Sequence, residues 1–255
     1  MPVFFEKSGN TFIGTDVSKS PWDETALNGV LIGGLFGHLF EHHVDFTAMS
    51  PGRLSIDILR PVPLETEWEV RLTRPGKNIQ MFEATLHTGG EVHAKAYLSC
   101  IRKANMPAFH SPGVDLFNHP LPAEVKPRER STDYSISPAI HSLSVIDPLD
   151  NPGHGVVWMN FHYDMLEGVP VTPFVQACMM ADMGHGTSRA LDMDHWLFIN
   201  IDLNIVFNRM PQTSWQLIDA RMESHGGGNA IAHSRFADEN GFFAMGLQSL
   251  FIDKR

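Results

Sequence analysis

Three polar side chains lie where a folded chain is expected to bury them, and together they have the chemistry to hold a water molecule. Asp182 follows Phe174 and Cys178 at intervals of four residues, so all three share one face of a helix. That face is otherwise apolar, and a buried carboxylate without partners is costly. Asp182 must therefore find hydrogen-bond donors or take up a proton, unless it lies at the edge of the apolar stripe and meets water.

The position of Gln248 favours the interpretation in which Asp182 is buried. It lies in the apolar run from Phe242 to Ile252, where its small neighbours Ala244 and Gly246 leave room beside the amide. A glutamine that faces inward needs partners for both ends of its amide. A water bridging Asp182 and Gln248 would satisfy both groups. The alternative is a glutamine on the solvent face or at an interface.

Asn200 is the third candidate. It starts a run in which Ile201, Leu203, Ile205 and Phe207 alternate with polar residues, which is the pattern of a half-buried strand. Asn200 either closes the polar cluster or faces solvent with the other polar residues of that strand.

Some of the fourteen histidines also have the chemistry for a site. His185 comes one helical turn after Asp182 and would share its site, whereas the pair His42-His43 with Asp45 resembles a base and its orienting acid. Adjacent helical residues diverge by about 100°, which weakens the second grouping. Gly226–Gly228 lacks the lysine and the strand–loop–helix context of a phosphate-binding loop, so a flexible turn is the better interpretation.

Sequence motifs and composition limit the class of protein. The chain has no H-E-x-x-H, C-x-x-C or G-x-S-x-G motif, so we expect no metal, no cofactor and no serine-hydrolase elbow.

A formal net charge of −10 and the lack of a basic run argue against nucleic-acid and membrane-surface partners. No apolar window reaches the roughly 18 residues of a membrane span, and no signal peptide is readable. Cys100 and Cys178 form no disulfide framework, so we expect a soluble cytoplasmic protein.

The elements that must position these residues occur twice. The first copy begins with Leu54–Pro63 and the second with Ile201–Pro211, each followed by a Trp and a Gly turn. Arg60 matches Arg209, and the offset between matched residues stays between 147 and 151. A repeat of this length indicates a duplicated domain, since solenoid units recur every ~20–50 residues.

Each copy is predicted to begin with one helix, over Asn28–Val44 and from Thr172 to about Leu191. Thr172 suits an N-cap and Pro173 the first helical position. The first helix contains four glycines, including Gly33-Gly34, each costing roughly 1 kcal/mol relative to alanine. Their concentration indicates close approach of another backbone or a ligand, with plain packing against a sheet as the alternative.

Period-2 strands follow each helix, which predicts an α+β fold. We expect each antiparallel sheet to curl around its helix and the two units to join edge to edge, which removes exposed strand edges. The expected units are 1–103 and 153–255. Residues 104–152 hold eight of the seventeen prolines and are expected to be a linker along the surface. The other expected strands are Trp68–Thr73, Phe82–His87, Val92–Ile101, Trp215–Met222, Ile231–Asp238 and Phe242–Ile252.

Taken in order, these motifs resemble the TesB-like acyl-CoA thioesterases, which are double hotdog proteins. The resemblance spans nearly the full length. It rests on Gly33-Gly34, Arg60-Pro61, the region of Trp158, Pro173 to Asp182, Ile201-Asp202, Arg209, Pro211, Trp215, and Gly241 to Gln248.

This resemblance implies that a water attacks the thioester carbonyl of acyl-CoA, a reaction of fatty acid metabolism. In the family an Asp, a Thr or Ser, and a Gln orient that water. Asp182 and Gln248 match two of these positions, and Asn200 stands where Thr or Ser is usual. The resemblance also implies a homodimer and no cofactor, and Gly33-Gly34 from the other half is a candidate substrate-binding oxyanion donor.

Two other functions stay open. Hotdog enoyl-CoA hydratases and dehydratases use a histidine with an acid, and His185 beside Asp182 fits that description. A noncatalytic acyl-CoA-binding protein with a degenerate site is motivated by the departure at Asn200.

Overall fold

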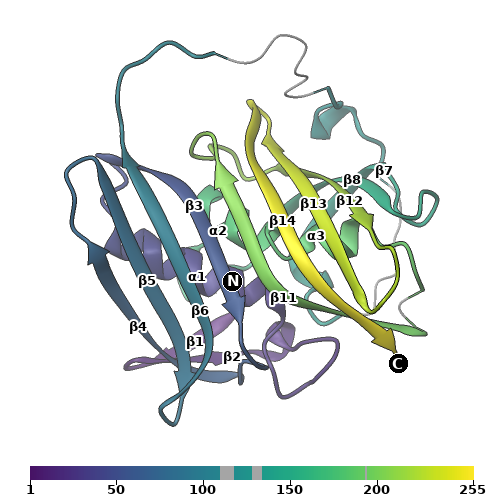
Figure 1. Cartoon of the computed structure of the whole chain (residues 1–255), viewed down its shortest axis with the longest axis horizontal. Coiled ribbons are helices and arrows are strands. Elements are labelled where there is room, and N and C mark those ends of the chain that lie inside the picture. The colour runs from purple at the N-terminus through teal and green to yellow at the C-terminus, as the bar shows by residue number, and fades with distance from the viewer. Residues whose placement is uncertain (110–117, 128–133, 193) are drawn as a thin grey trace.

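A single large antiparallel sheet curls around the helices of the chain (Figure 1). The computed structural model describes residues 1–109, 118–127, 134–192 and 194–255. Within these residues twelve strands form one continuous sheet, in the order β1-β2-β4-β5-β6-β3-β11-β14-β13-β12-β8-β7. The predicted α+β class and antiparallel strands are confirmed.

Residues of the first sequence copy supply one half of this sheet. Counted outward from the middle of the sheet, the order is β3, β6, β5, β4, β2 and β1. A 3₁₀ turn, η1 (Asp16–Ser18), follows the hairpin of β1 and β2. The strand bounds are β1 Phe5–Ser8, β2 Thr11–Gly14, β3 Met49–Ile58, β4 Glu65–Arg74, β5 Ile79–Thr88 and β6 Glu91–Arg102.

The second copy repeats this order. From the middle outward the strands are β11, β14, β13 and β12, which correspond to β3, β6, β5 and β4, followed by β8 and β7. A small separate pair, β9 (Asp164–Leu166) and β10 (Val169–Pro170), precedes the second helix. The remaining bounds are β7 Ile140–Ile146, β8 His154–Phe161, β11 Trp196–Phe207, β12 Gln216–Glu223, β13 Asn229–Asp238 and β14 Gly241–Lys254.

The two halves meet where β3 pairs with β11. Leu54 lies opposite Ile205 and Ile56 opposite Leu203, all in one antiparallel ladder. The expected edge-to-edge joining is confirmed, and it places the two sets of helices side by side behind one sheet (Figure 1).

Helix α1 (Gly29–His43) begins as predicted. The Asn28 side chain accepts a hydrogen bond from Val30 N–H at 3.0 Å, which caps the helix. Gly33, Gly34 and Gly37 lie against the second helix, and a Cβ on Gly33 would be 2.3 Å from the carbonyl oxygen of Cys178. The close approach of another backbone explains their concentration.

The prediction of one long second helix is wrong. Helix α2 (Pro173–Met180), capped by Thr172, ends before Asp182, and a short helix α3 (Met183–Thr187) follows. Gln248 inserts into the break: its Oε1 accepts from His185 N–H at 3.0 Å, and its Nε2 donates to the Asp182 carbonyl at 3.0 Å. In a continuous helix both groups would bond within the helix, so a side chain from β14 has replaced two helical hydrogen bonds.

The expected linker is more ordered than its prolines indicate. Its described residues include two 3₁₀ turns, η2 (Pro122–Glu124) and η3 (Ser137–Ala139), and the edge strand β7. The Trp158 indole donates to the Pro120 carbonyl at 2.8 Å and ties this segment to β8. Residues 110–117 and 128–133 of the expected linker lie outside the described residues, and the unit boundaries stay a prediction. Across the described chain, no helix has the length and apolar character of a membrane span.

Candidate active site

Asp182 lies at the break between α2 and α3 and is buried, with 6% of its surface exposed. Cys178 and Phe174, about one and two turns earlier, are buried as well, so this face of α2 is inside the protein. Burial raises the pKa of the Asp182 carboxyl, and the nearby His185 side chain and a hydrogen bond from Asn200 only partly offset this.

Asn200 reaches Asp182 because strand β11 carries a bulge. Asn200 lies opposite Leu250 and Asp202 lies opposite Ser249, which leaves one extra residue between them. One extra residue exchanges the two faces of a strand. The side chain of Asn200 is therefore buried, whereas Ile201 is 52% exposed, so the expected inward position of Ile201 is wrong.

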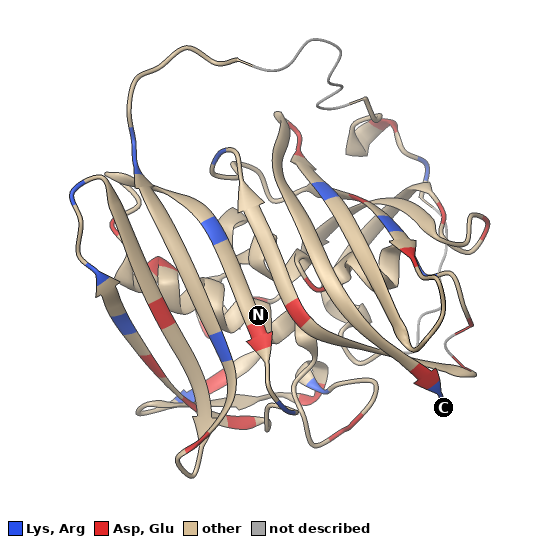
Figure 2. Cartoon of the chain, in the orientation of Figure 1, with Lys and Arg blue, Asp and Glu red and all other residues tan. Residues whose placement is uncertain are grey.

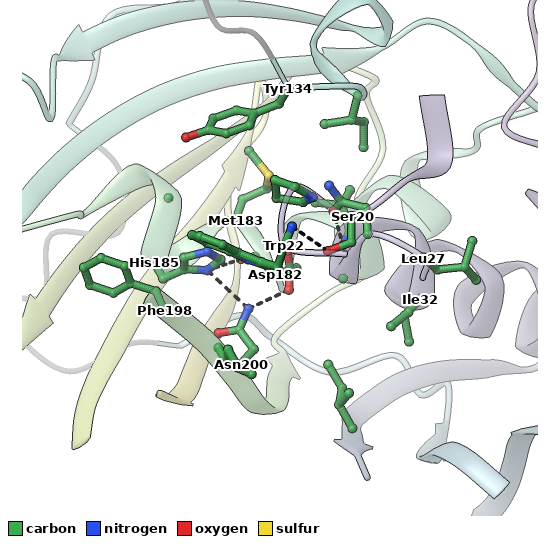
Figure 3. A pocket seen from close by; sticks show the side chains of 18 of the residues that line it. Ser20, Trp22, Leu27, Ile32, Tyr134, Asp182, Met183, His185, Phe198 and Asn200 are labelled. Carbon is green, nitrogen blue, oxygen red and sulfur yellow. Dashed lines mark hydrogen bonds between the residues drawn. The ribbon is translucent and has the colours of Figure 1, made fainter. Parts of the chain in front are cut away.

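Backbone groups fix the direction of the hydrogen bonds in this cluster. Because Gln248 Oε1 accepts from the His185 N–H, its Nε2 end must face Asn200. Asn200 then presents Oδ1 to Gln248 at 3.3 Å and Nδ2 to Asp182 Oδ1 at 2.6 Å. Asp182 and Asn200 point toward one another in Figure 3. The carboxylate is thus held by Asn200, while Gln248 holds Asn200 and the backbone.

Gln248 therefore has a different contact from the one expected. Both ends of its amide are engaged, and the contact with Asp182 is to the backbone carbonyl rather than to the carboxylate. Gly184 permits this approach, since a Cβ there would be 2.1 Å from Gln248 Oε1. Gln248 therefore supports the cluster through Asn200 and the backbone rather than by contacting the carboxylate.

A cavity of about 500 Å³ opens beside the carboxylate. It lies between the start of α1, the loop before that helix, the end of β3, strand β11 and helix α3 (Figure 3). Two basic residues contribute to its wall, Arg60, which pairs with Glu91, and Arg189. The apolar part of the wall includes Trp22, Leu27, Ile32, Ile58, Val62, Ile136, Val157, Met159, Met183 and Phe198.

The glycines expected to meet the substrate, Gly33 and Gly34, do not line this cavity. Gly33 and Gly34 lie in the contact between α1 and α2, whereas Gly29 and Val30 line the cavity. A Cβ on Gly29 would be 2.2 Å from Asp182 Oδ1. The first residue of α1 therefore lies against the carboxylate, and the helix brings its positive end to the site. The Asn28 N-cap is the sequence signal that could have identified this residue.

The two other groupings considered from the sequence, the histidine pair with Asp45 and the glycine run, are not assembled as sites. The ring nitrogens of His42 and His43 contact the carbonyls of His38 and Leu39, one turn earlier in α1, rather than Asp45. Gly226–Gly228 lies in the turn between β12 and β13. Within the described ranges, no three His, Cys, Asp or Glu side chains are placed to hold a metal ion.

Hotdog-fold proteins of known structure match the chain over nearly its whole length. A hotdog-fold protein of unknown function from Alicyclobacillus acidocaldarius aligns with a TM-score of 0.76 and 15% identity, covering 98% of this chain and 95% of its own. The acyl-CoA thioesterase II TesB2 from Mycobacterium marinum aligns with a TM-score of 0.68 and 18% identity, covering 98% and 96%. At these identities the likeness establishes the fold alone: this is a hotdog-fold protein.

Family models identify the chain more closely. The model of the acyl-CoA thioesterase N-terminal domain matches residues 18–101, and that of the C-terminal domain matches residues 119–252, more than half of the chain. No curated protein matches the sequence significantly. The chain belongs to the acyl-CoA thioesterase family and is a thioester hydrolase.

Proposed function

We propose that the protein hydrolyses acyl-CoA to the free acid and CoA with a water activated by Asp182. The observation that carries this proposal is a buried carboxylate at the wall of a largely apolar cavity, held on one side by Asn200. The raised pKa of Asp182 supports the role, because a general base works best when its pKa approaches the working pH.

The reaction balances with these groups. Asp182 takes a proton from the water as its oxygen bonds to the thioester carbonyl carbon. The carbon–sulfur bond then breaks, and the departing CoA sulfur takes the proton from Asp182, which restores the carboxylate. Asn200 and Gln248 do not transfer protons and instead hold the carboxylate toward the cavity.

Asn200 suits this task although Ser or Thr is usual in similar proteins. Its amide donates to Asp182 and accepts from Gln248 at the same time. The departure therefore preserves a bridge between the carboxylate and β14, which supports an active enzyme over a degenerate site.

The N-terminus of α1 is the proposed place for the carbonyl oxygen. The N–H groups of a first helical turn have no partner within the helix, and the helix dipole favours negative charge there. The Asn28 side chain accepts a hydrogen bond from the Val30 N–H, so that N–H is already engaged. The N–H of Gly29 is therefore our candidate donor to the developing oxyanion. Gly29 and Asp182 come from different copies of the repeat.

Turnover of a panel of acyl-CoA esters, followed with a thiol reagent, tests this function. Asp182→Asn should lower kcat by roughly 10²–10⁴-fold, as expected for loss of a general base. The exposed Asp194 provides a matched control, and Asp194→Asn should be fully active. Full activity of Asp182→Asn with an unchanged circular dichroism spectrum would show that the site is elsewhere. Tight binding without turnover by the wild type would favour the noncatalytic alternative.

Hydration or dehydration of acyl-CoA substrates is the second candidate, because His185 also lines the cavity beside Asp182. Absorbance of the enoyl thioester distinguishes the two activities. Hydration of crotonyl-CoA without thiol release would favour the hydratase.

We also propose that each sequence copy forms one hotdog unit and that double hotdogs pair into a homodimer. The outer face of the sheet carries few charges over β11 and β14 (Figure 2). An exposed apolar face of this kind marks an association surface. The exposed apolar residues on β6, β11, β13 and β14 include Tyr97, Ile101, Ile199, Ile201, Val206, Ile231, Met245, Leu247 and Phe251.

A cytoplasmic location, expected from the two cysteines, stays a prediction.

A further inference from the structure

His185 is a polar group of the cavity that the proposed mechanism does not yet use. It lies on α3, lines the cavity and is half-buried. Its backbone N–H is taken by Gln248. On the ring, Nδ1 faces the cluster, 3.2 Å from Asn200 Nδ2 and 3.1 Å from the Asp182 carbonyl. The opposite ring nitrogen, Nε2, has no hydrogen-bond partner among the described residues.

The cluster determines which ring nitrogen carries the proton. One N–H of Asn200 goes to Asp182 Oδ1, and the second has His185 Nδ1 as its neighbour. If Nδ1 were protonated, two donors would face each other and a buried N–H would stay unsatisfied, which costs about 1–3 kcal/mol. If Nδ1 is bare, it accepts from Asn200, and the Asp182 carbonyl keeps its bond from Gln248. The second arrangement gives an acceptor to each side-chain N–H of Asn200 and Gln248.

A neutral ring with a bare Nδ1 carries its proton on Nε2. The network of Gln248 and Asn200 therefore leaves a hydrogen-bond donor on the ring nitrogen that does not face the cluster. His185 and Asp182 both line the same cavity (Figure 3).

We propose that the Nε2–H of His185 donates a hydrogen bond to the carbonyl oxygen of the bound thioester, which makes His185 a catalytic residue of this enzyme. The inference rests on the proposed function. No proton is transferred from the ring. As water adds to the carbonyl carbon, negative charge grows on the oxygen, and the bond from Nε2 strengthens at that moment. Such a bond stabilises the transition state more than the bound substrate.

Two substitutions separate a donor at Nε2 from a general structural role. The amide nitrogen of a glutamine reaches about as far as Nε2, whereas that of an asparagine reaches only the place of Nδ1. Both variants keep the backbone N–H that bonds to Gln248. His185→Asn should lower kcat by roughly 10²–10³-fold, as expected for a lost oxyanion donor, with KM nearly unchanged. His185→Gln should stay within about tenfold of wild type.

The control is His225→Asn, because His225 is exposed in the turn between β12 and β13, and it should behave as wild type. Circular dichroism and the Tm of each variant establish that it folds. Affinity for an alkyl-CoA thioether, which lacks the thioester carbonyl oxygen, should be the same in wild type and in His185→Asn.

The outcomes are distinct. Rescue by His185→Gln but not by His185→Asn supports the donor. Wild-type kcat in both variants, or an equal loss in both folded variants, overturns it. Asp182→Asn is measured alongside, since its full activity would remove the proposed function itself. A loss of kcat in Asp182→Asn with wild-type rates in both His185 variants leaves the proposed function standing and removes only the role of His185.

Discussion

Gln248 bridges the backbones of Asp182 and His185 at the break between α2 and α3, because its amide accepts from the His185 N–H and donates to the Asp182 carbonyl. A strand residue thus determines where a helix ends. The carboxylate of Asp182 is placed by this interruption, and the orientation of Asn200 follows from the same amide.

Removal of the Gln248 amide should therefore reduce both activity and stability. Gln248→Ala removes the hydrogen bonds of one buried and one partly buried backbone group, and a buried group left without a partner costs about 1–3 kcal/mol. The kcat should fall by roughly 10²–10⁴-fold, like that of Asp182→Asn. The double variant should lose little more, because residues acting as a unit are non-additive. Kinetics with urea unfolding provides both readouts, with Gln80→Ala on β5 as the control. Additive losses in the double variant would contradict a single unit.

A methyl group at the start of α1 should affect catalysis more than folding. Gly29→Ala places its Cβ against the carboxylate of Asp182, a side chain that can move. Misplacement by about 1 Å costs up to roughly 10²-fold in rate, so we expect a kcat loss of this order. Gly33→Ala is the comparison, since its Cβ meets the backbone of α2 and should lower the Tm instead. Equal effects of both variants on kcat would refute this distinction.

The pH dependence of stability should reveal the buried carboxyl. The pKa of Asp182 is raised in the folded protein above the ordinary 3.8 by burial, so the folded state binds the proton more tightly than the unfolded chain. Stability should then fall as the pH rises from 3.8 through the folded pKa, and stay level above it. Asp182→Asn should remove this loss and be more stable than wild type at neutral pH, with the gain vanishing below pH 3.8.

Thermal unfolding of both proteins between pH 3 and pH 8 measures this difference. A variant less stable than wild type at pH 7 would show that the charged carboxylate stabilises the fold.

The turnover rate should change with pH in the opposite sense to stability. Asp182 acts as a base only when ionised, so turnover should rise with pH through the same pKa.

The homodimer predicts a measurable mass. Light scattering at micromolar concentration should give about twice the chain mass of 28.5 kDa. Leu247 is 48% exposed on the outer face of β14, and Leu247→Glu should shift the mass toward the monomer, because a charge in an apolar interface is costly to bury. Glu223→Gln, at an exposed strand end, is the control. A wild-type mass near 28.5 kDa would rule out the dimer.

Local sequence signals predicted the repeated parts of the fold well. Thr172 is the predicted N-cap and accepts from the Val175 N–H within its own first turn, and strand alternation needs only neighbouring residues. The offset between Arg60 and Arg209 anticipated the shared strand order of the two halves.

The missed features depend on contacts that are distant in sequence. The break at Asp182 requires Gln248, which is 66 residues away. The bulge at Asn200 shows only in its pairing with β14, and the sequence continues its alternation through it. The close approach predicted at Gly33 is confirmed, but the identity of the approaching neighbour cannot be inferred from one helix.

The bulge that turns Asn200 inward has a counterpart in the first copy. In β3 the register shifts between Pro51 and Arg53, and Pro51 precedes Asn200 by the same 149 residues that separate Arg60 from Arg209. Both copies thus bend the strand, but only the second puts an amide at the bend. The two halves are alike in backbone and unequal in chemistry, so titration with a tight-binding acyl-CoA analogue should reach saturation at one molecule per chain rather than two.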